Sequence, residues 1–265
     1  MNILILGGNR FVGKSIADTL SSNNTVTVLN RTGTPNSVCT VIKCDRDNVD
    51  DLKTYIGNVK YDLIIDMCCY NYRQVQELES VLTHLPDKYI CMSTLAVTEP
   101  AFGDYTEGKL KVEYYLSMIS KLPYVILRPG YILGEGNPHK RIQYYTEQLI
   151  NNQPIDVAED GNFPIVVAAK DEIVEDVLSA ISSQRTRYIK FDTRGFNTTP
   201  NKLITYLTEH TKHTPTIEYN SVGTLFDIQI KSSDKQYNRD ELLRTLVIDL
   251  YEHYYLINYY KNVLL

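Results

Sequence analysis

Residues 6–13 read Leu6-Gly7-Gly8-Asn9-Arg10-Phe11-Val12-Gly13. This stretch directly follows an apolar, strand-like run and opens a pattern of helical spacing over residues 12–22. Glycine at position 7 permits a tight turn, and the missing side chain at position 13 lets the helix pack closely on the strand. A pyrophosphate group binds at the helix N-terminus in such a turn, although Arg10 replaces the middle glycine of the usual fingerprint. The stretch therefore predicts the first strand–turn–helix unit of a dinucleotide-binding α/β fold.

The first half of the chain alternates short, β-branched runs with longer amphipathic ones. The strand-like runs are residues 2–6, 25–29, 39–43, 61–66, 88–93 and 123–128. The helical patterns between them are residues 12–22, 49–57, 71–84 and 105–121. Strands separated by helices of this length pair in parallel and are covered on both faces. We therefore expect a Rossmann-type, doubly wound parallel sheet in a dinucleotide-binding domain over residues 1–130.

The pattern is looser after residue 130. Helical patterns near residues 138–151, 170–183 and 199–211 alternate with strand candidates near residues 164–168, 187–192 and 215–218. We expect a smaller C-terminal α/β substrate lobe over residues 131–265, partly interleaved with the first domain. The last helical pattern, residues 239–262, is rich in tyrosine and is typical of a packed amphipathic helix.

Composition excludes several classes of protein. The 265 residues carry a formal net charge of −5, which argues against a nucleic-acid or membrane-surface binder. No apolar run approaches the roughly 18 residues that span a bilayer. The chain enters a strand directly after Met1 without a cationic leader, which favours the cytoplasm. The 5 cysteines include no C-x-x-C pair, and His210 and His213 have no ligand cluster beside them, so we expect neither disulfides nor a metal.

The end of the second strand indicates which dinucleotide binds. NAD enzymes place an acidic residue there to hold the ribose 2′-hydroxyl, whereas an arginine accommodates the 2′-phosphate of NADP. This chain has Asn30-Arg31 and no acid at that position. A guanidinium can bind a phosphate in bidentate fashion, so NADP(H) is favoured and NAD(H) is the alternative. The competing interpretation is that Arg31 is a solvated loop residue.

A second group of chemically useful residues lies near the fifth strand. Tyr105 and Lys109 are four residues apart in a helical pattern, so they project from one face. An ammonium about 5 Å from the phenol stabilises its phenolate by about 3 kcal/mol at an effective dielectric of about 20. Ser93-Thr94 ends the fifth strand, where open α/β sheets bind ligands, and places hydroxyls near the same substrate oxygen. Alone, the Tyr–Lys pair is equally consistent with a surface helix.

Together these signals resemble the short-chain dehydrogenase/reductase superfamily, in its extended or atypical NAD(P)-dependent epimerase/dehydratase branch. Residues 7–13 look like a Gly-Gly-x-Arg-Phe-Val-Gly variant of that branch, which makes Arg10 a feature of a subgroup. The resemblance covers about residues 1–210. It departs from typical sugar-nucleotide members because only 11 positions lead from Thr94 to Tyr105, and because the tyrosine-rich C-terminus matches no family motif.

The resemblance implies roles for individual residues. It assigns catalysis to Thr94, Tyr105 and Lys109, and contacts with the substrate to Thr94 and Arg141. Asp45 resembles the aspartate that contacts the adenine amino group. The full set implied to bind the cofactor is Gly7, Asn9, Arg10, Phe11, Val12, Gly13, Asn30, Arg31, Asp45, Cys68, Cys69, Ser93, Tyr105, Lys109, Arg128 and Gly130. Residues 128–138 resemble the stretch that leads into the substrate lobe, and Asp171 resembles a motif acid.

The implied activity is proton and hydride transfer at a nucleotide-linked sugar, as 4-keto reduction or epimerisation, with reduction slightly favoured. A 4,6-dehydratase would need an acidic pair after Thr94, where Leu95-Ala96 stand. The alternative is a non-catalytic member of the superfamily that senses a dinucleotide or binds RNA. The acidic charge argues against RNA, and the complete Thr–Tyr–Lys set argues against a sensor.

The family also implies a homodimer. Its members often pair through the Tyr-x-x-x-Lys helix, and here Val112, Tyr115, Leu116 and Ile119 form an apolar stripe on that helix. The competing interpretation is a monomer in which the C-terminal tyrosine-rich helix covers the stripe.

Overall fold

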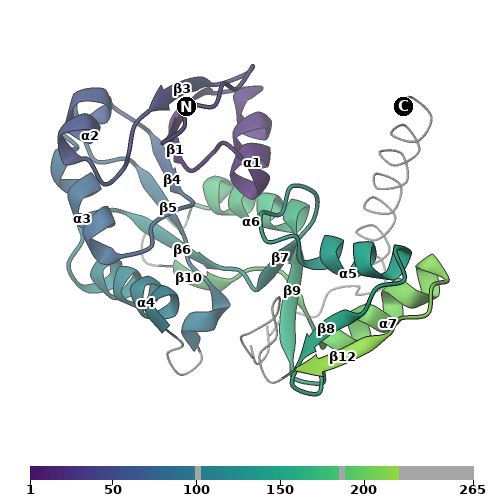
Figure 1. Cartoon of the computed structure of the whole chain (residues 1–265). Helices are drawn as coiled ribbons and strands as arrows, with labels where there is room; N and C mark the ends of the chain where they lie inside the picture. The colour runs from purple at the N-terminus through teal and green to yellow at the C-terminus, as the bar shows by residue number, and fades with distance from the viewer. Residues whose placement is uncertain (99–102, 185–188, 221–265) are drawn as a thin grey trace. The chain divides into compact units, whose positions relative to one another are not determined.

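The structure, a computed structural model, describes residues 1–98, 103–184 and 189–220. They form two compact units, of which the first comprises Met1–Pro129 and Asp171–Thr193. A seven-stranded sheet, parallel throughout, is the centre of this unit (Figure 1). Its strands, in spatial order, are β10 (Ile189–Asp192), β6 (Tyr124–Arg128), β5 (Lys88–Met92), β4 (Leu63–Asp66), β1 (Asn2–Leu6), β2 (Thr25–Asn30) and β3 (Thr40–Lys43).

Helices cover both faces of this sheet, as the alternating pattern predicts. In Figure 1, α1 (Phe11–Ser21) and α6 (Lys170–Ser182) lie on one face. On the other face lie α2 (Val49–Ile56), α3 (Tyr72–Val81) and α4 (Gly103–Met118). Every residue of β4 and β5 is buried, which explains why these strands read as continuous apolar runs. The expected Rossmann-type, doubly wound sheet is therefore confirmed, with its order reversing between β1 and β4.

Local chemistry sets several of the helix ends. Asn48 caps α2 by accepting a hydrogen bond from the Asp51 amide, and Asn71 caps α3 in the same way through the Gln74 amide. The end of α6 is held differently, by a buried lysine from β5. Lys88 Nζ donates to the carbonyl oxygens of Ala180, Ile181 and Ser183 at 2.6, 2.8 and 2.9 Å. This cation satisfies acceptors that a helix C-terminus leaves without intrahelical partners.

The second unit comprises Gly130–Lys170 and the chain from Arg194 onward, of which the structure describes residues up to 220. β9 (Ile165–Ala169) pairs in parallel with β7 (Tyr131–Leu133) and antiparallel with β11 (Phe196–Thr198). A second, parallel pair joins β8 (Ile155–Ala158) to β12 (Ile217–Asn220). The described residues of this unit form the helices α5 (Arg141–Ile150) and α7 (Pro200–Thr211). The sequence did not indicate β7, β8 or β11, which are only 3, 4 and 3 residues long.

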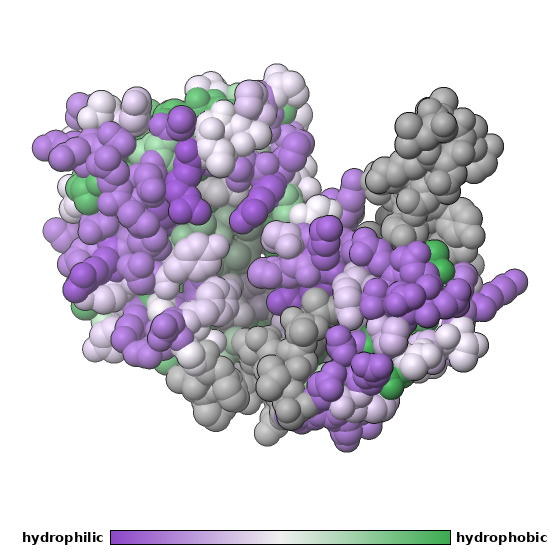
Figure 2. Space-filling view, in the orientation of Figure 1, coloured by the Kyte–Doolittle hydropathy of each residue, from purple (hydrophilic) through white to green (hydrophobic). Residues whose placement is uncertain are grey.

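The visible face of the first unit is predominantly hydrophilic, as Figure 2 shows. Among the described residues no helix combines the length and apolarity that crossing a membrane requires. The tyrosine-rich segment 239–262, expected to be helical, lies outside the described residues.

Candidate functional site

The glycine turn after β1 has the geometry that its sequence predicts. Gly7 has a φ of +85°, a backbone conformation that side-chain-bearing residues rarely adopt. A Cβ on Gly13 would lie 2.3 Å from the carbonyl oxygen of Gly7, so only glycine lets α1 start this close to the turn. A Cβ on Gly7 would meet Cys68 Sγ at 3.3 Å. The loop after β4, which carries Cys68, therefore borders the turn.

The N-terminus of α1 is open to a ligand. Arg10 occupies the capping position in an extended conformation, and its exposed side chain makes no capping hydrogen bond. Phe11 follows with a φ of +49°, an unfavourable value for a large side chain that is typical of functional turns. Asn9 is half-buried, and Val12 is buried in the core. The amide groups that start α1 thus lack a side-chain cap, and a phosphate group is the acceptor that such a terminus attracts.

Asn30 and Arg31 stand at the end of β2, the strand next to β1. The Asn30 side-chain oxygen accepts hydrogen bonds from Thr32 Oγ1 at 2.9 Å and the Gly33 amide at 2.7 Å, which fixes the loop. Its Nδ2 atom is buried and has no partner among the described residues. Arg31 is exposed and next to it. A buried amide donor without a partner in the described chain, beside an exposed guanidinium, suits an anionic, hydroxyl-bearing ligand.

A buried ion pair lies beneath the loop that carries Asp45, and no motif in the sequence indicated it. Arg46 Nη1 donates to Asp66 Oδ1 at 2.7 Å, and the hydroxyl of Tyr89 donates to Asp66 Oδ2 at 2.8 Å. Burial by itself raises the pKa of Asp66, but the charge of Arg46 and these hydrogen bonds outweigh it and hold the pKa below its ordinary value. Asp45 itself is exposed. The pair therefore anchors the loop and leaves the Asp45 carboxylate accessible.

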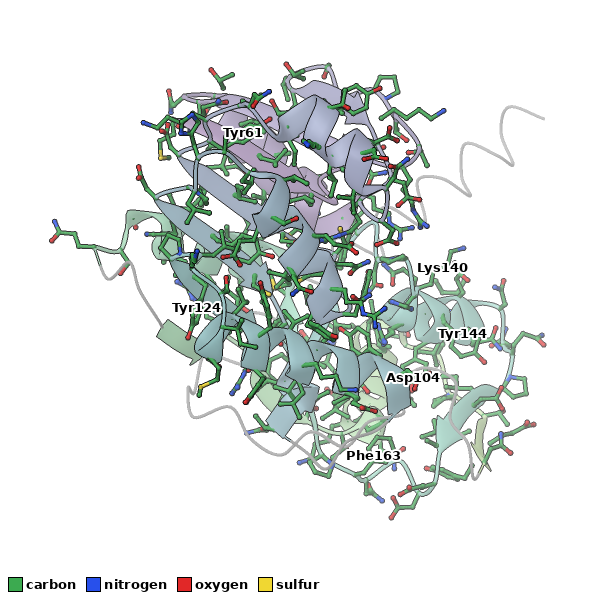
Figure 3. The ribbon with its side chains drawn as sticks, turned by 90° about the vertical axis from the view of Figure 1, so that its left-hand side faces the viewer. Tyr61, Asp104, Tyr124, Lys140, Tyr144 and Phe163 are labelled. Carbon is green, nitrogen blue, oxygen red and sulfur yellow. The ribbon has the colours of Figure 1, made fainter. Side chains whose placement is uncertain are left out.

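Tyr105 and Lys109 meet on α4, as their spacing predicts. Tyr105 is 47% exposed, whereas Lys109 is only 2% exposed. Lys109 Nζ donates to the Met92 carbonyl at 2.7 Å and lies 5.9 Å from the centre of the Tyr105 ring. Burial by itself lowers the pKa of Lys109, but the negative charges that Cys69 and other neighbouring acidic groups can carry together outweigh it and hold the pKa above its ordinary value. Figure 3 labels Asp104, which precedes Tyr105 in the first turn of α4.

The two hydroxyl residues that follow β5, Ser93 and Thr94, have different hydrogen-bond partners. Ser93 Oγ donates to Glu113 Oε1 at 2.6 Å, and Arg128 binds both carboxylate oxygens of Glu113, at 3.0 and 2.6 Å. The side chains of Ser93 and Arg128 thus share one buried carboxylate of α4. Thr94, by contrast, accepts a long hydrogen bond of 3.3 Å from the Ala96 amide in the short 3₁₀ helix η1 (Leu95–Thr98). Within the described part of the chain its hydroxyl donates no hydrogen bond, so its proton could be given to a substrate oxygen.

Three other residues expected in the site lie in the core of the first unit or in the second unit. Cys69 is fully buried with its Sγ 3.2 Å from Cys91 Sγ, so its side chain faces the core. Gly130 belongs to the second unit, where a Cβ would lie 2.4 Å from the Val166 carbonyl oxygen. Arg141, in the first turn of α5, places its guanidinium 4.7 Å from the centre of the Tyr131 ring in the same unit.

Tyr70 and Gly108 belong to the site but were missed from the sequence. The Tyr70 ring lies 5.1 Å from Lys109 Nζ and 6.3 Å from the Tyr105 ring. A Cβ on Gly108 would lie 2.2 Å from the Tyr70 carbonyl oxygen, so α4 presses directly on the loop after β4. The glycine one residue before Lys109 was the available signal, because glycine inside a helix needs a packing reason.

Comparison of the structure with solved structures finds the same fold in UDP-sugar 4-epimerases. UDP-glucose 4-epimerase from Thermotoga maritima, solved with UDP-glucose, gives a TM-score of 0.79 at 17% identity, over 96% of this chain and 99% of that one. UDP-glucuronic acid 4-epimerase from Bacillus cereus, solved with UDP-glucuronic acid and NAD, gives 0.76 at 16% identity, over 95% and 99%. UDP-N-acetylglucosamine 4-epimerase from Methanobrevibacter ruminantium M1, in complex with UDP-N-acetylmuramic acid, gives 0.73 at 18% identity, over 93% and 97%.

No protein-family model and no curated protein sequence matches the chain. The class that the structure defines is thus a Rossmann-type α/β fold with a second α/β unit. Within that class, the chain has the fold of the UDP-sugar 4-epimerases, as the sequence resemblance predicts.

Proposed function

We propose that this protein is a nicotinamide-dinucleotide-dependent enzyme that acts on a hydroxyl or keto carbon of a nucleotide-linked sugar. One observation carries the proposal: the exposed phenol of Tyr105 lies beside the buried ammonium of Lys109, at the carboxyl edge of a sheet whose first turn is shaped for a pyrophosphate. Proton-transferring and dinucleotide-binding groups are both part of the first unit.

Each of the three proposed catalytic residues has a distinct task. Tyr105 takes the proton from the sugar hydroxyl, or returns it to the ketone oxygen, while its neighbour Lys109 stabilises the phenolate by charge. Thr94 donates a hydrogen bond to the same oxygen and stabilises the charge that develops there. The dinucleotide, when bound, supplies the hydride acceptor and donor. Free tyrosine is only about one part in a thousand phenolate at pH 7, so the ammonium is essential to this assignment.

The residues present fit a dinucleotide. The uncapped start of α1 suits the pyrophosphate, Asp45 is exposed for the adenine amino group, and Asn30 offers an unpaired donor to the adenosine ribose. We propose NADP(H) as the preferred form because Arg31, and no carboxylate, follows Asn30. The B. cereus epimerase was solved with NAD, which makes NAD(H) the competing choice.

Fluorescence titration tests this preference. NADPH should bind at least about tenfold tighter than NADH, a difference of about 1.4 kcal/mol. Arg31→Ala should remove most of that difference. Lys60→Ala is the matched control, because this exposed lysine precedes β4 and so lies at the opposite edge of the sheet. Equal affinities for the two dinucleotides in the wild-type protein contradict the NADP assignment.

The fold of the relatives favours epimerisation as the reaction. All three reported neighbours are 4-epimerases of UDP-linked sugars, and we propose Arg141 of the second unit as a contact for such a substrate. The specific observation that favours 4-keto reduction instead is the NADP-type end of β2, because NADPH is consumed in a net reduction. Epimerisation needs only bound dinucleotide, whereas reduction consumes one equivalent of it.

Product analysis separates the two reactions. The purified protein is incubated with a panel of UDP-sugars and a trace of dinucleotide, and separately with a UDP-4-keto sugar and stoichiometric NADPH. Proton NMR of the sugar reports an inverted C4 centre, and absorbance at the nicotinamide band reports NADPH consumption. Inversion without consumption establishes the epimerase, and consumption with the keto sugar establishes the reductase. If the protein binds the dinucleotide but catalyses neither reaction, it belongs to the non-catalytic class that senses a dinucleotide.

The homodimer also remains a proposal, with a corrected contact surface. Val112, Tyr115 and Leu116 of the expected stripe are buried within the first unit, whereas Ile119 is exposed. Besides Tyr105, the large apolar side chains exposed along α4 and just after it are Leu110, Tyr114, Met118 and Ile119. The tyrosine-rich segment that would compete for this surface lies outside the described residues. Light scattering at micromolar concentration should give twice the chain mass of 30.4 kDa, and a value near the single mass contradicts the dimer.

A further inference from the structure

Two aromatic rings, rather than one, flank the ammonium of Lys109. Its Nζ atom lies 5.1 Å from the centre of the Tyr70 ring and 5.9 Å from that of the Tyr105 ring. Both distances fall within the roughly 6 Å over which a ring face attracts a cation. The two rings are 6.3 Å apart and tilted by 51°. Tyr70 comes from the loop after β4, so this second ring reaches Lys109 from a different element.

The backbone of Tyr70 is held on both sides. Its amide donates to Gln74 Oε1 at 2.7 Å, and Gln74 Nε2 in turn donates to Asp47 Oδ1 at 2.7 Å. Its carbonyl oxygen lies against Gly108, where even a Cβ would come within 2.2 Å. The loop is therefore fixed to α4 and to the loop that carries Asp45. Tyr70 is nevertheless 52% exposed, so the ring that contacts Lys109 also borders solvent.

We propose that Tyr70 is a positioning residue for Lys109. The Tyr70 ring covers the Lys109 ammonium and keeps it directed at Tyr105 and at the dinucleotide ribose. Lysine has three N–H donors, and one of them is bound by the Met92 carbonyl. A ring face attracts the cation without accepting a directed hydrogen bond, so it leaves the remaining donors for a ligand. It also displaces water from the ammonium, and a lower local dielectric strengthens the attraction between Lys109 and Tyr105.

The role belongs to the ring and not to the phenol hydroxyl of Tyr70. Tyr70→Phe keeps the ring face over the ammonium, whereas Tyr70→Leu keeps a similar apolar volume without π electrons. The ribose part of the proposal rests on the proposed function, but the contact between ring and ammonium does not. Two readouts are therefore needed, one with a dinucleotide and one without.

A double-mutant cycle tests the proposal. NADPH affinity is measured by fluorescence for wild type, Tyr70→Leu, Lys109→Met and the double variant, with Tyr70→Phe as the conservative variant. Tyr70→Leu should weaken binding by about fivefold in the wild-type background and by less than about 1.5-fold in the Lys109→Met background. Tyr70→Phe should stay within about twofold of wild type. An equal loss in both backgrounds, or a Tyr70→Phe loss as large as that of Tyr70→Leu, overturns the assignment.

The same cycle is read in urea denaturation without ligand. If Tyr70 acts through Lys109, Tyr70→Leu lowers the urea midpoint in the wild-type background more than it does in the Lys109→Met background. Additive changes in the midpoint show that the ring and the ammonium do not interact, which also overturns the proposal. If wild-type protein binds no dinucleotide while the midpoints remain coupled, the proposed function fails and the role of Tyr70 in holding Lys109 stands.

Discussion

Replacing Gly108 by alanine tests how closely α4 packs against the loop after β4. A Cβ at this position would lie 2.2 Å from the Tyr70 carbonyl oxygen, and ordinary contact begins at 3.4 Å. The helix and the loop must therefore separate by about 1.2 Å, the difference between these distances. The atom in the way belongs to the backbone, which cannot rotate aside as a side chain would. Overpacking of this kind costs about 1–3 kcal/mol.

The higher helix propensity of alanine opposes this cost, so the sign of the change in stability shows which effect is larger. Alanine is favoured over glycine inside a helix by about 1 kcal/mol, so a Gly108 without close contacts would give a more stable protein on substitution. We expect Gly108→Ala to lower the free energy of unfolding by about 1–2 kcal/mol, because the overpacking exceeds the gain in helix propensity. It should also weaken NADPH binding, since Tyr70 and Lys109 then move apart.

Urea denaturation and NADPH titration measure the two effects. Lys111→Ala is the matched control, because its exposed ion pair with Glu107 lies on the solvent side of the same helix, where such pairs contribute little to stability. Its stability and NADPH affinity should stay close to wild type. A Gly108→Ala protein at least as stable as wild type, with unchanged affinity, would refute the close seating of α4 on the Tyr70 loop.

Three further predictions concern buried charges in the first unit. Lys88→Met should lower the free energy of unfolding, measured in urea, by about 2–4 kcal/mol, because three carbonyl acceptors at the end of α6 lose their donor. The control is Lys53→Met at an exposed site, and a loss of stability no larger than that of the control contradicts the prediction. Asp66 has a lowered pKa in the folded protein, so its stabilising contribution is complete above the ordinary value of 3.8 and is lost as the pH falls below it. Asp66→Asn should thus flatten the fall in stability between about pH 5 and pH 2, and an unchanged slope argues against the pair with Arg46. Glu113→Gln should cost about 3–5 kcal/mol because it removes the buried carboxylate charge that pairs with the Arg128 guanidinium. A loss below about 1 kcal/mol, the range of a surface pair, contradicts a buried pair.

Much of the fold could be predicted because its signals are local. The central strands of the seven-stranded sheet are buried and read as apolar runs, and the observed ends of all seven strands differ from the predicted ones by at most two residues. The short strands β7, β8 and β11 were missed because three or four residues are too few to show a period. The chain enters a second compact unit at Gly130. The assignment of dinucleotide binding to residues 1–130 and of substrate binding to residues 131–265 is still a prediction.

The candidate site likewise contains residues that local motifs predict and residues that they do not. Gly7, Gly13, Tyr105 and Lys109 could be found because each motif needs fixed spacing within one strand–turn–helix element. The residues that hold them come from other elements, and their contacts depend on the register of the sheet. Arg46 reaches Asp66 across 20 positions, and Tyr70 meets Lys109 from the loop after β4. Nothing local in the sequence distinguishes such residues from ordinary surface arginine and tyrosine.

The most direct test of the proposed chemistry is the single-turnover rate of a Tyr105→Phe protein. The substitution keeps the ring beside Lys109 and removes only the hydroxyl that carries the proton. With NADPH and a UDP-4-keto sugar for the reductase, or a UDP-sugar and bound dinucleotide for the epimerase, the chemical step should fall by about 10²- to 10⁴-fold. Dinucleotide affinity should be retained, and Tyr114→Phe, on the exposed side of α4, should match wild type. A Tyr105→Phe rate within about threefold of wild type, less than 1 kcal/mol in the barrier, would contradict the account.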